Sequence, residues 1–184
     1  MNNKLKEILD TANYKGNTPL ITAVSSNNYK VTEYLIEHFA DINKPNFFGY
    51  TPLIVSVKHQ NETLTKYLVT HGANINKYDL SGYTPLSIAM EKPNKKLIKY
   101  LIDHGADVNA KIKHQESPID FAIRSNNKKL IKYLVDHGAD INTVDLNCYT
   151  IIRYATKQFN PLLFSFLVEL RAKFSEYSPT EAYS

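Results

Sequence analysis

The stretch from Tyr83 to Asn109, YTPLSIAMEKPNKKLIKYLIDHGADVN, decides the fold because close copies of it lie on both sides at a constant offset. Its Thr-Pro-Leu start has counterparts, each 33 residues from the next, at 18–20, 51–53, 117–119 and 150–152. Its end, HGADVN, recurs in similar form at 38–43, 71–76 and 137–142. A chain tiled at this period predicts a stacked array of short units.

Each unit carries the signals of two helices. Thr84 precedes Pro85, and a Thr hydroxyl followed by Pro is a favourable helix start because Pro lacks an N–H that would have no partner there. From Leu97 to Ile102 the apolar positions follow the helical period, which predicts a longer second helix. Gly105 then ends this helix.

An asparagine stands between the two predicted helices of every unit. The five positions are Asn28, Asn61, Asn94, Asn127 and Asn160. Asn tolerates the left-handed conformation that ends helices. We therefore expect these residues to form the turn, in that conformation.

The composition is that of a folded protein with a mild positive charge. Of the 184 residues, 22% are charged and 43% are hydrophobic, and the formal net charge is +4. Cys148 is the only cysteine, which fits a reducing compartment. The N-terminus has no apolar core like that of a signal peptide, and no stretch reaches the ~18 apolar residues of a membrane span. We predict a cytoplasmic protein, and a secretion address outside these residues stays open.

No pattern predicts catalysis, a cofactor, a metal site or a small-molecule substrate. Four histidines recur at one repeat position: His38, His71, His104 and His137. Stacked helices lie roughly 8–10 Å apart, so neighbouring imidazoles would not share a zinc ion. We interpret them as residues of the helix C-terminus, where an imidazolium favours the negative end of the dipole. The recurring Asp41, Asp107 and Asp140 are interpreted as loop formers.

The Thr-Pro-Leu start, the Gly-Ala-Asp-Val-Asn end and the 33-residue step resemble the ankyrin repeat family. The resemblance implies an all-α solenoid of five helix-turn-helix repeats with projecting hairpin loops, and a non-catalytic role in protein–protein interaction. We place a helical lead-in at 1–12, the ankyrin domain at 13–177 and a flexible tail at 178–184. The repeats are expected at 13–45, 46–78, 79–111, 112–144 and 145–177.

The family binds partners mainly through its hairpin tips and short first helices. Mapped onto this chain, the hairpin positions are Tyr14, Lys15, Phe47, Phe48, Tyr50, Tyr78, Leu80, Tyr83, Lys113, His114 and Tyr149. The positions on the adjoining helix ends are Lys58, His59, Glu91, Lys92, Arg124 and Lys157. Exposed aromatic residues are typical of binding hot spots. Packing between hairpins is an equal alternative for Tyr50, Tyr83 and Tyr149. We expect a protein partner with an apolar segment, and an acidic segment that meets the more basic repeats four and five.

Two repeats depart from the pattern. The hairpin of repeat four lacks the Asp-x-x-Gly seen at 79–82, and repeat five has Cys148 where Gly is expected, so we predict that both hairpins are distorted or more mobile. The second helix of repeat five is also more hydrophobic, because it contains Leu162, Leu163, Phe164, Phe166 and Leu167. We expect a monomer, and a dimer or assembly role through repeat five is the alternative.

A basic band is a further alternative. Lysines recur on the second helices at Lys66, Lys95, Lys96, Lys99, Lys128, Lys129 and Lys132. Such a band could meet nucleic acid or anionic lipid, but lysine on an exposed helix face is also the common solubilising choice, and we do not expect either partner. Some ankyrin proteins are hydroxylated at the loop asparagine to which Asn109 corresponds.

Overall fold

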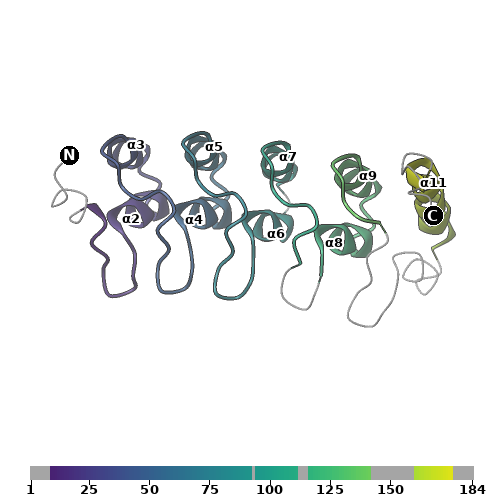
Figure 1. Cartoon of the computed structure of the whole chain (residues 1–184), viewed down its shortest axis with the longest axis horizontal. Coiled ribbons are helices and arrows are strands. Elements are labelled where there is room, and N and C mark those ends of the chain that lie inside the picture. Colours follow the sequence, from purple (N-terminus) through teal and green to yellow (C-terminus); the bar gives the residue numbers. More distant parts are fainter. Residues whose placement is uncertain (1–8, 93, 112–115, 142–159, 176–184) are drawn as a thin grey trace, which may run out of the picture. The chain divides into compact units, whose positions relative to one another are not determined.

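Pairs of helices make up the part of the chain that the structure, a computed structural model, describes: residues 9–92, 94–111, 116–141 and 160–175 (Figure 1). Short first helices are α2 (Pro19–Ser25), α4 (Pro52–Lys58), α6 (Pro85–Met90) and α8 (Pro118–Arg124). Longer second helices are α3 (Tyr29–Glu37), α5 (Glu62–Thr70), α7 (Lys95–Asp103), α9 (Lys128–Asp136) and α11 (Pro161–Ser175). No strand occurs within these ranges, which confirms the all-helical repeat fold.

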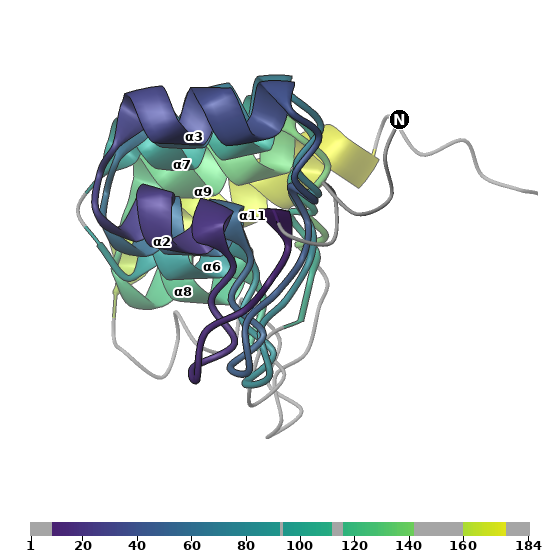
Figure 2. The ribbon, with the colours of Figure 1, turned by 90° about the vertical axis from the view of Figure 1, so that its left-hand side faces the viewer.

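The chain divides into two compact units, residues 1–107 and 108–184. In the first unit, α2, α4 and α6 form one layer and α3, α5 and α7 form the other (Figure 1). The loops that enter the first helices leave one end of the layers and extend past α2, away from α3 (Figure 2). We call the loops at 10–18, 43–51 and 76–84 hairpins one, two and three. The second unit contains α8, α9 and α11, and α11 contacts α9.

The helix starts form as the Thr-Pro pairs predict. The hydroxyl of Thr51 accepts a hydrogen bond from the backbone N–H of Ile54 at 3.2 Å, and Thr18 and Thr84 make the same bond. Ser117 adds a capping box, because its own N–H donates to the Asp120 carboxylate at 2.8 Å. Caps of this kind each stabilise a helix by about 1 kcal/mol.

The prediction of a left-handed backbone at the turn asparagines is wrong for those the structure shows. Asn28 and Asn61 have φ values of −90° and −84°, and their side chains accept from the N–H groups of Val31 and Leu64. They are N-caps of the second helices, as are Asn94, Asn127 and Asn160. The left-handed residue is the one before: Asn27, Gln60 and Asn126. A capping side chain requires negative φ at its own residue, so the turn shifts back by one.

Leucines at matching positions build the core. The first helices bury Leu20, Leu53 and Leu86, and α8 has Ile119 at this position. The second helices bury Leu35, Leu64, Leu68, Leu97, Leu101, Leu134, Leu163, Leu167 and Leu170. Burial of each side chain is worth roughly 2–3 kcal/mol. Ala23, Ser56, Ala89 and Ala122 are buried at one repeat position of the first helices, and the Ser56 hydroxyl shares a 2.9 Å hydrogen bond with Thr65. Close approach of paired helices therefore uses small side chains, as expected.

Asparagine side chains connect neighbouring repeats, a feature that sequence reasoning missed. The Asn76 amide nitrogen donates to the Gly105 carbonyl at 3.1 Å, and its oxygen accepts from the Asp107 N–H at 2.8 Å. Asn43 makes the equivalent bonds to Gly72 and Asn74 in repeat two. Asn109 makes them to Gly138 and Asp140 within the second unit. Each such pair satisfies backbone groups at the end of a helix, where no intrahelical partner exists.

Several predictions fall outside the described residues. They concern most of the lead-in at 1–12, the tail at 178–184, the hairpin at 112–115 and the hairpin that contains Cys148. The domain boundaries and the distortion of the last two hairpins therefore stay predictions.

Candidate partner-binding surface

Each hairpin of the first unit is closed by one side chain. The Oδ1 atom of Asn46 accepts from the N–H groups of Phe48 and Tyr50, both at 2.9 Å. Asn13 does the same in hairpin one, and Asp79 in hairpin three. Asp and Asn favour such turns because their short side chains reach backbone donors two residues on. The hairpin backbone between these bonds is thus fixed by hydrogen bonds to one side chain.

Neighbouring hairpins are joined through their backbones. The Phe47 N–H donates to the Lys15 carbonyl at 3.3 Å, and the Leu80 N–H donates to the Phe48 carbonyl at 3.1 Å. Gly49 has φ of +78°, and a Cβ atom there would lie 2.5 Å from the Leu80 nitrogen. Glycine is required at this position because the backbones approach so closely. Hairpins one to three therefore form one continuous surface.

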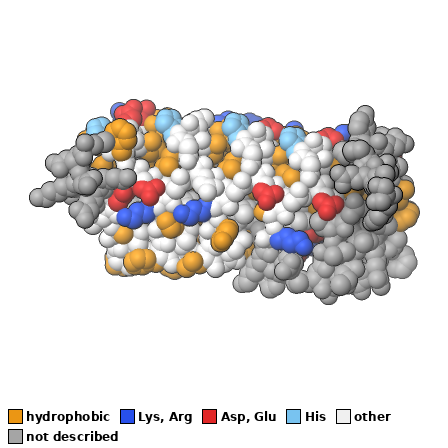
Figure 3. Space-filling view, viewed as in Figure 1, with side chains coloured by type: hydrophobic (Ala, Val, Ile, Leu, Met, Phe, Trp, Pro, Cys, Tyr) orange, Lys and Arg blue, Asp and Glu red, His pale blue; other side chains and the backbone are white. Residues whose placement is uncertain are grey.

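Large apolar side chains are exposed along these hairpins. Their exposed fractions are 85% for Tyr14, 69% for Phe47, 54% for Phe48, 69% for Tyr78 and 79% for Leu80. With the exposed Lys15, these six residues are called the hairpin surface, and hydrophobic side chains recur along this edge in Figure 3. Burial of such groups against a partner would remove them from water.

Tyr50 and Tyr83 are half-buried. The Tyr50 ring stacks with Phe48 at a centroid distance of 5.9 Å, and the Lys58 ammonium lies 4.3 Å from the Tyr50 centroid. Lys58 also donates to the Tyr50 hydroxyl at 3.1 Å. Tyr50 therefore packs against residues of its own repeat while staying half-buried, and its role in binding stays a prediction.

The predicted helix-end residues that the structure describes are exposed but differ in their surroundings. Lys58, His59, Glu91 and Lys92 lie at the ends of α4 and α6. Arg124 lies in the second unit and forms an ion pair with Glu116. The other predicted residues, Lys113, His114, Tyr149 and Lys157, lie outside the described residues.

On the second helices, histidines stack on tyrosines four residues earlier. The Tyr67 and His71 rings lie 3.9 Å apart, and His71 Nδ1 lies 2.7 Å from the Tyr67 carbonyl oxygen. A carbonyl only accepts, so Nδ1 carries the hydrogen. The pairs at 34/38 and 100/104 have the same contacts. At 133/137 the Nδ1 contact recurs, but the rings are tilted by 37° with centroids 4.3 Å apart. The recurring Tyr-x-x-x-His spacing was a signal for this stack that sequence reasoning did not use.

Burial affects two of these tyrosines. It raises the pKa of Tyr67 above its ordinary value of 10.0, and the carboxylates of Glu33 and Glu37 raise it further. Burial also raises the pKa of Tyr100. Both causes disfavour the phenolate, so these rings serve as neutral packing groups.

Several lysines of the proposed basic band have partners within the protein. The Lys66 ammonium lies 5.6 Å from the Tyr100 centroid, Lys128 donates to the Leu162 carbonyl, and Lys132 pairs with Asp136 at 2.9 Å. These contacts fit lysines that cover and solubilise their own helices. They give no support to an anionic partner on the second helices.

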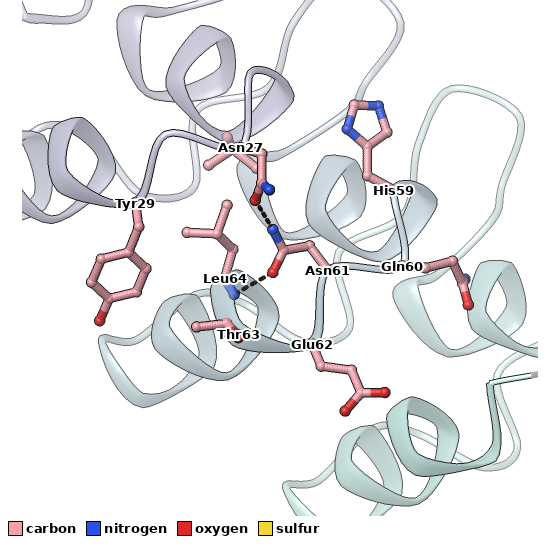
Figure 4. A pocket seen from close by; sticks show the side chains of 9 residues that line it. Asn27, Tyr29, His59, Gln60, Asn61, Glu62, Thr63 and Leu64 are labelled. Atoms are coloured by element: carbon pink, nitrogen blue, oxygen red, sulfur yellow. Dashed lines mark hydrogen bonds between the residues drawn. The ribbon is translucent and has the colours of Figure 1, made fainter.

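An open pocket of about 670 Å³ lies where first helices turn into second helices, lined by Asn27, Tyr29, His59, Asn61 and Glu62 among others. In Figure 4, the Asn61 side chain donates to Asn27 and accepts from the Leu64 N–H, while His59 and Glu62 point in opposite directions. The side-chain amides of Asn27 and Asn61 are thus already used to cap α5 and to join two turns. The pocket includes His59 but none of the hairpin surface.

Among the described residues, no group of three His, Cys, Asp or Glu side chains could hold a metal ion. Within the same ranges, no helix combines the length and hydropathy required to cross a membrane.

The fold and this surface define a helical repeat protein with paired helices and projecting, mutually bonded hairpins. Family models agree: "Ankyrin repeats (3 copies)" matches residues 45–112 and 77–145, and "Ankyrin repeats (many copies)" matches residues 20–69. The chain belongs to the ankyrin repeat family, whose members are generally non-enzymatic protein-interaction modules. Among curated proteins, none matches the chain.

Proposed function

We propose that this chain is a non-catalytic recognition module that binds a partner protein through the hairpin surface and the adjoining ends of the first helices. The observation that carries the proposal is the exposure of Tyr14, Phe47, Phe48, Tyr78 and Leu80 on three hairpins joined by backbone hydrogen bonds. Because the hairpins are already ordered, binding would cost little conformational entropy. Aromatic anchors on an ordered surface are the usual source of binding energy.

The test is partner capture by the intact chain, repeated with Phe47→Ala combined with Phe48→Ala. We expect binding to weaken by about 2 kcal/mol or more, because both rings lose their contact with the partner. Circular dichroism should be unchanged, since both side chains are exposed. The matched control is Tyr34→Ala on α3, whose side chain is 56% exposed, close to the 54% of Phe48.

Lys99→Ala, on the exposed face of α7, serves as a second control and should change little. If Tyr34→Ala or Lys99→Ala abolishes partner capture while the double phenylalanine substitution has no effect, the proposal is contradicted and the binding site lies on the second helices.

Assembly through repeat five is a second candidate, favoured by one observation. Apolar side chains of α11 are exposed, at 71% for Leu162, 37% for Phe164 and 43% for Val168. The molar mass in solution tests it. A dimer that Phe164→Ser converts to monomer supports assembly, and a monomer at all concentrations contradicts it.

A further inference from the structure

One lysine of the first unit is fixed beside the exposed aromatics. Phe48, Tyr50 and Lys58 form a continuous contact from hairpin two to the end of α4, which we call the aromatic–lysine cluster. The Lys58 ammonium is bonded to the Tyr50 hydroxyl at 3.1 Å while its side chain stays exposed. An ammonium has three N–H donors, so two remain for another molecule.

The charge of Lys58 is not neutralised in the structure. Among the described residues no carboxylate pairs with Lys58, whereas Arg124 pairs with Glu116 and Lys132 with Asp136 in the second unit. Lys44 and Lys77 donate to the carbonyls of Asp10 and Asn43. The exposed Lys15 lies over the Tyr14 ring at 5.5 Å, on hairpin one. Asp79 is buried and its Oδ1 atom accepts two backbone bonds. An oriented positive charge thus lies next to apolar side chains that are open to a partner.

The neighbouring repeats of the first unit do not reproduce this cluster. Counted by the 33-residue period, the positions of Tyr50 and Lys58 hold Asn17 and Ser25 in repeat one. In repeat three they hold Tyr83 and Glu91, so the charge is reversed. A partner's negative group would be attracted at repeat two and repelled at repeat three.

We propose that the aromatic–lysine cluster binds a carboxylate of the partner, which lies beside an apolar side chain seated on Phe47 and Phe48. This inference rests on the proposed function and specifies the partner as an acidic, apolar polypeptide segment. It places the acidic contact at repeat two, whereas the sequence alone suggested repeats four and five, where Arg124 is already paired. A single lysine charge matches the single negative charge of a carboxylate, whereas a phosphorylated side chain carries about −2 and is typically met by a cluster of arginines.

The experiment selects peptides from a displayed random library against the full chain. Selected peptides should contain Asp, Glu or a free C-terminal carboxylate next to an aromatic or aliphatic residue. One such peptide is then synthesised with its acid intact and with the acid replaced by its amide, which also distinguishes a side-chain carboxylate from a terminal one. Affinities of both forms are measured for the parent chain, Lys58→Gln and Lys66→Gln. Lys66 is the matched control because it also lies over a tyrosine ring, that of Tyr100 on the second helices.

We expect Lys58→Gln to weaken binding of the acidic peptide about fivefold and to leave the amide peptide unchanged, because the lost term is a pairwise charge interaction. Lys66→Gln should change neither. Two results would contradict the acidic contact and leave the proposed function intact. Either the selected peptides bind through Phe47 and Phe48 but contain no acidic group, or their affinity is the same for the parent chain and Lys58→Gln. Peptides whose binding is indifferent to Phe47→Ala with Phe48→Ala would overturn the proposed function itself.

Discussion

Phe39 follows α3 in a backbone conformation that other repeats give to glycine. Its φ is +68°, and at the same repeat position Gly72, Gly105 and Gly138 have φ between +87° and +91°. A side chain other than Gly costs about 1–2 kcal/mol there. The Phe39 side chain is also 60% exposed, so the burial of its ring offsets little of this conformational penalty.

Phe39→Gly should therefore stabilise the protein by about 1 kcal/mol in urea unfolding. Phe39→Ala, which removes the ring but keeps the unfavourable conformation, should give no such gain. If Ala stabilises as much as Gly, the exposed ring and not the backbone is the source of the cost.

Residue roles were predictable where the cause is local. The Thr-Pro caps and the stop glycines follow from backbone chemistry within four residues, and the structure has them. The turn asparagines were misplaced by one residue, because both a turn former and an N-cap favour Asn, and the sequence Asn27-Asn28 offers it at both positions. Only the hydrogen bond to the Val31 N–H decides between them.

At the scale of elements, the hairpins depend on contact between their backbones. Gly49 and Gly72 both have positive φ, but an added Cβ would meet the backbone of Leu80 in the first case and nothing within 4 Å in the second. The pair therefore separates the cost of the conformation from the cost of the contact.

Gly72→Ala should cost about 1 kcal/mol of stability, which is the conformational penalty alone. Gly49→Ala should cost at least about 1 kcal/mol more, because hairpins two and three must move apart. Unfolding in urea measures both. Equal losses would mean that the hairpins separate freely and do not form one continuous surface.

Hairpin positions could be predicted from the period, but the bonds between hairpins could not. The Phe47 N–H and the Lys15 carbonyl belong to adjacent repeats, and their meeting depends on how the repeats stack. The contact of Lys58 with Tyr50 lies within repeat two, but it joins a hairpin to the end of a helix, and the period does not specify that side-chain geometry. Sequence reasoning named both residues of that contact without joining them.

At the scale of the whole molecule, the repeat period predicted the helical architecture. It did not predict the asparagine bridges, whose partners lie 29 and 31 residues away, or the division of the chain into two compact units. These depend on side-chain geometry across repeats, which no local pattern encodes. The exposure of the hairpin aromatics fits the mapped positions, while their role in binding stays a prediction.

The most direct measurement is hydrogen exchange of the full chain with and without a bound partner, read at single amides. Binding on the hairpin surface should slow exchange in hairpins one to three and at the end of α4, and leave the second helices α3, α5 and α7 unchanged, because only amides that a partner covers or orders gain protection. Slower exchange confined to α3, α5 and α7, with the hairpins unchanged, would contradict the account.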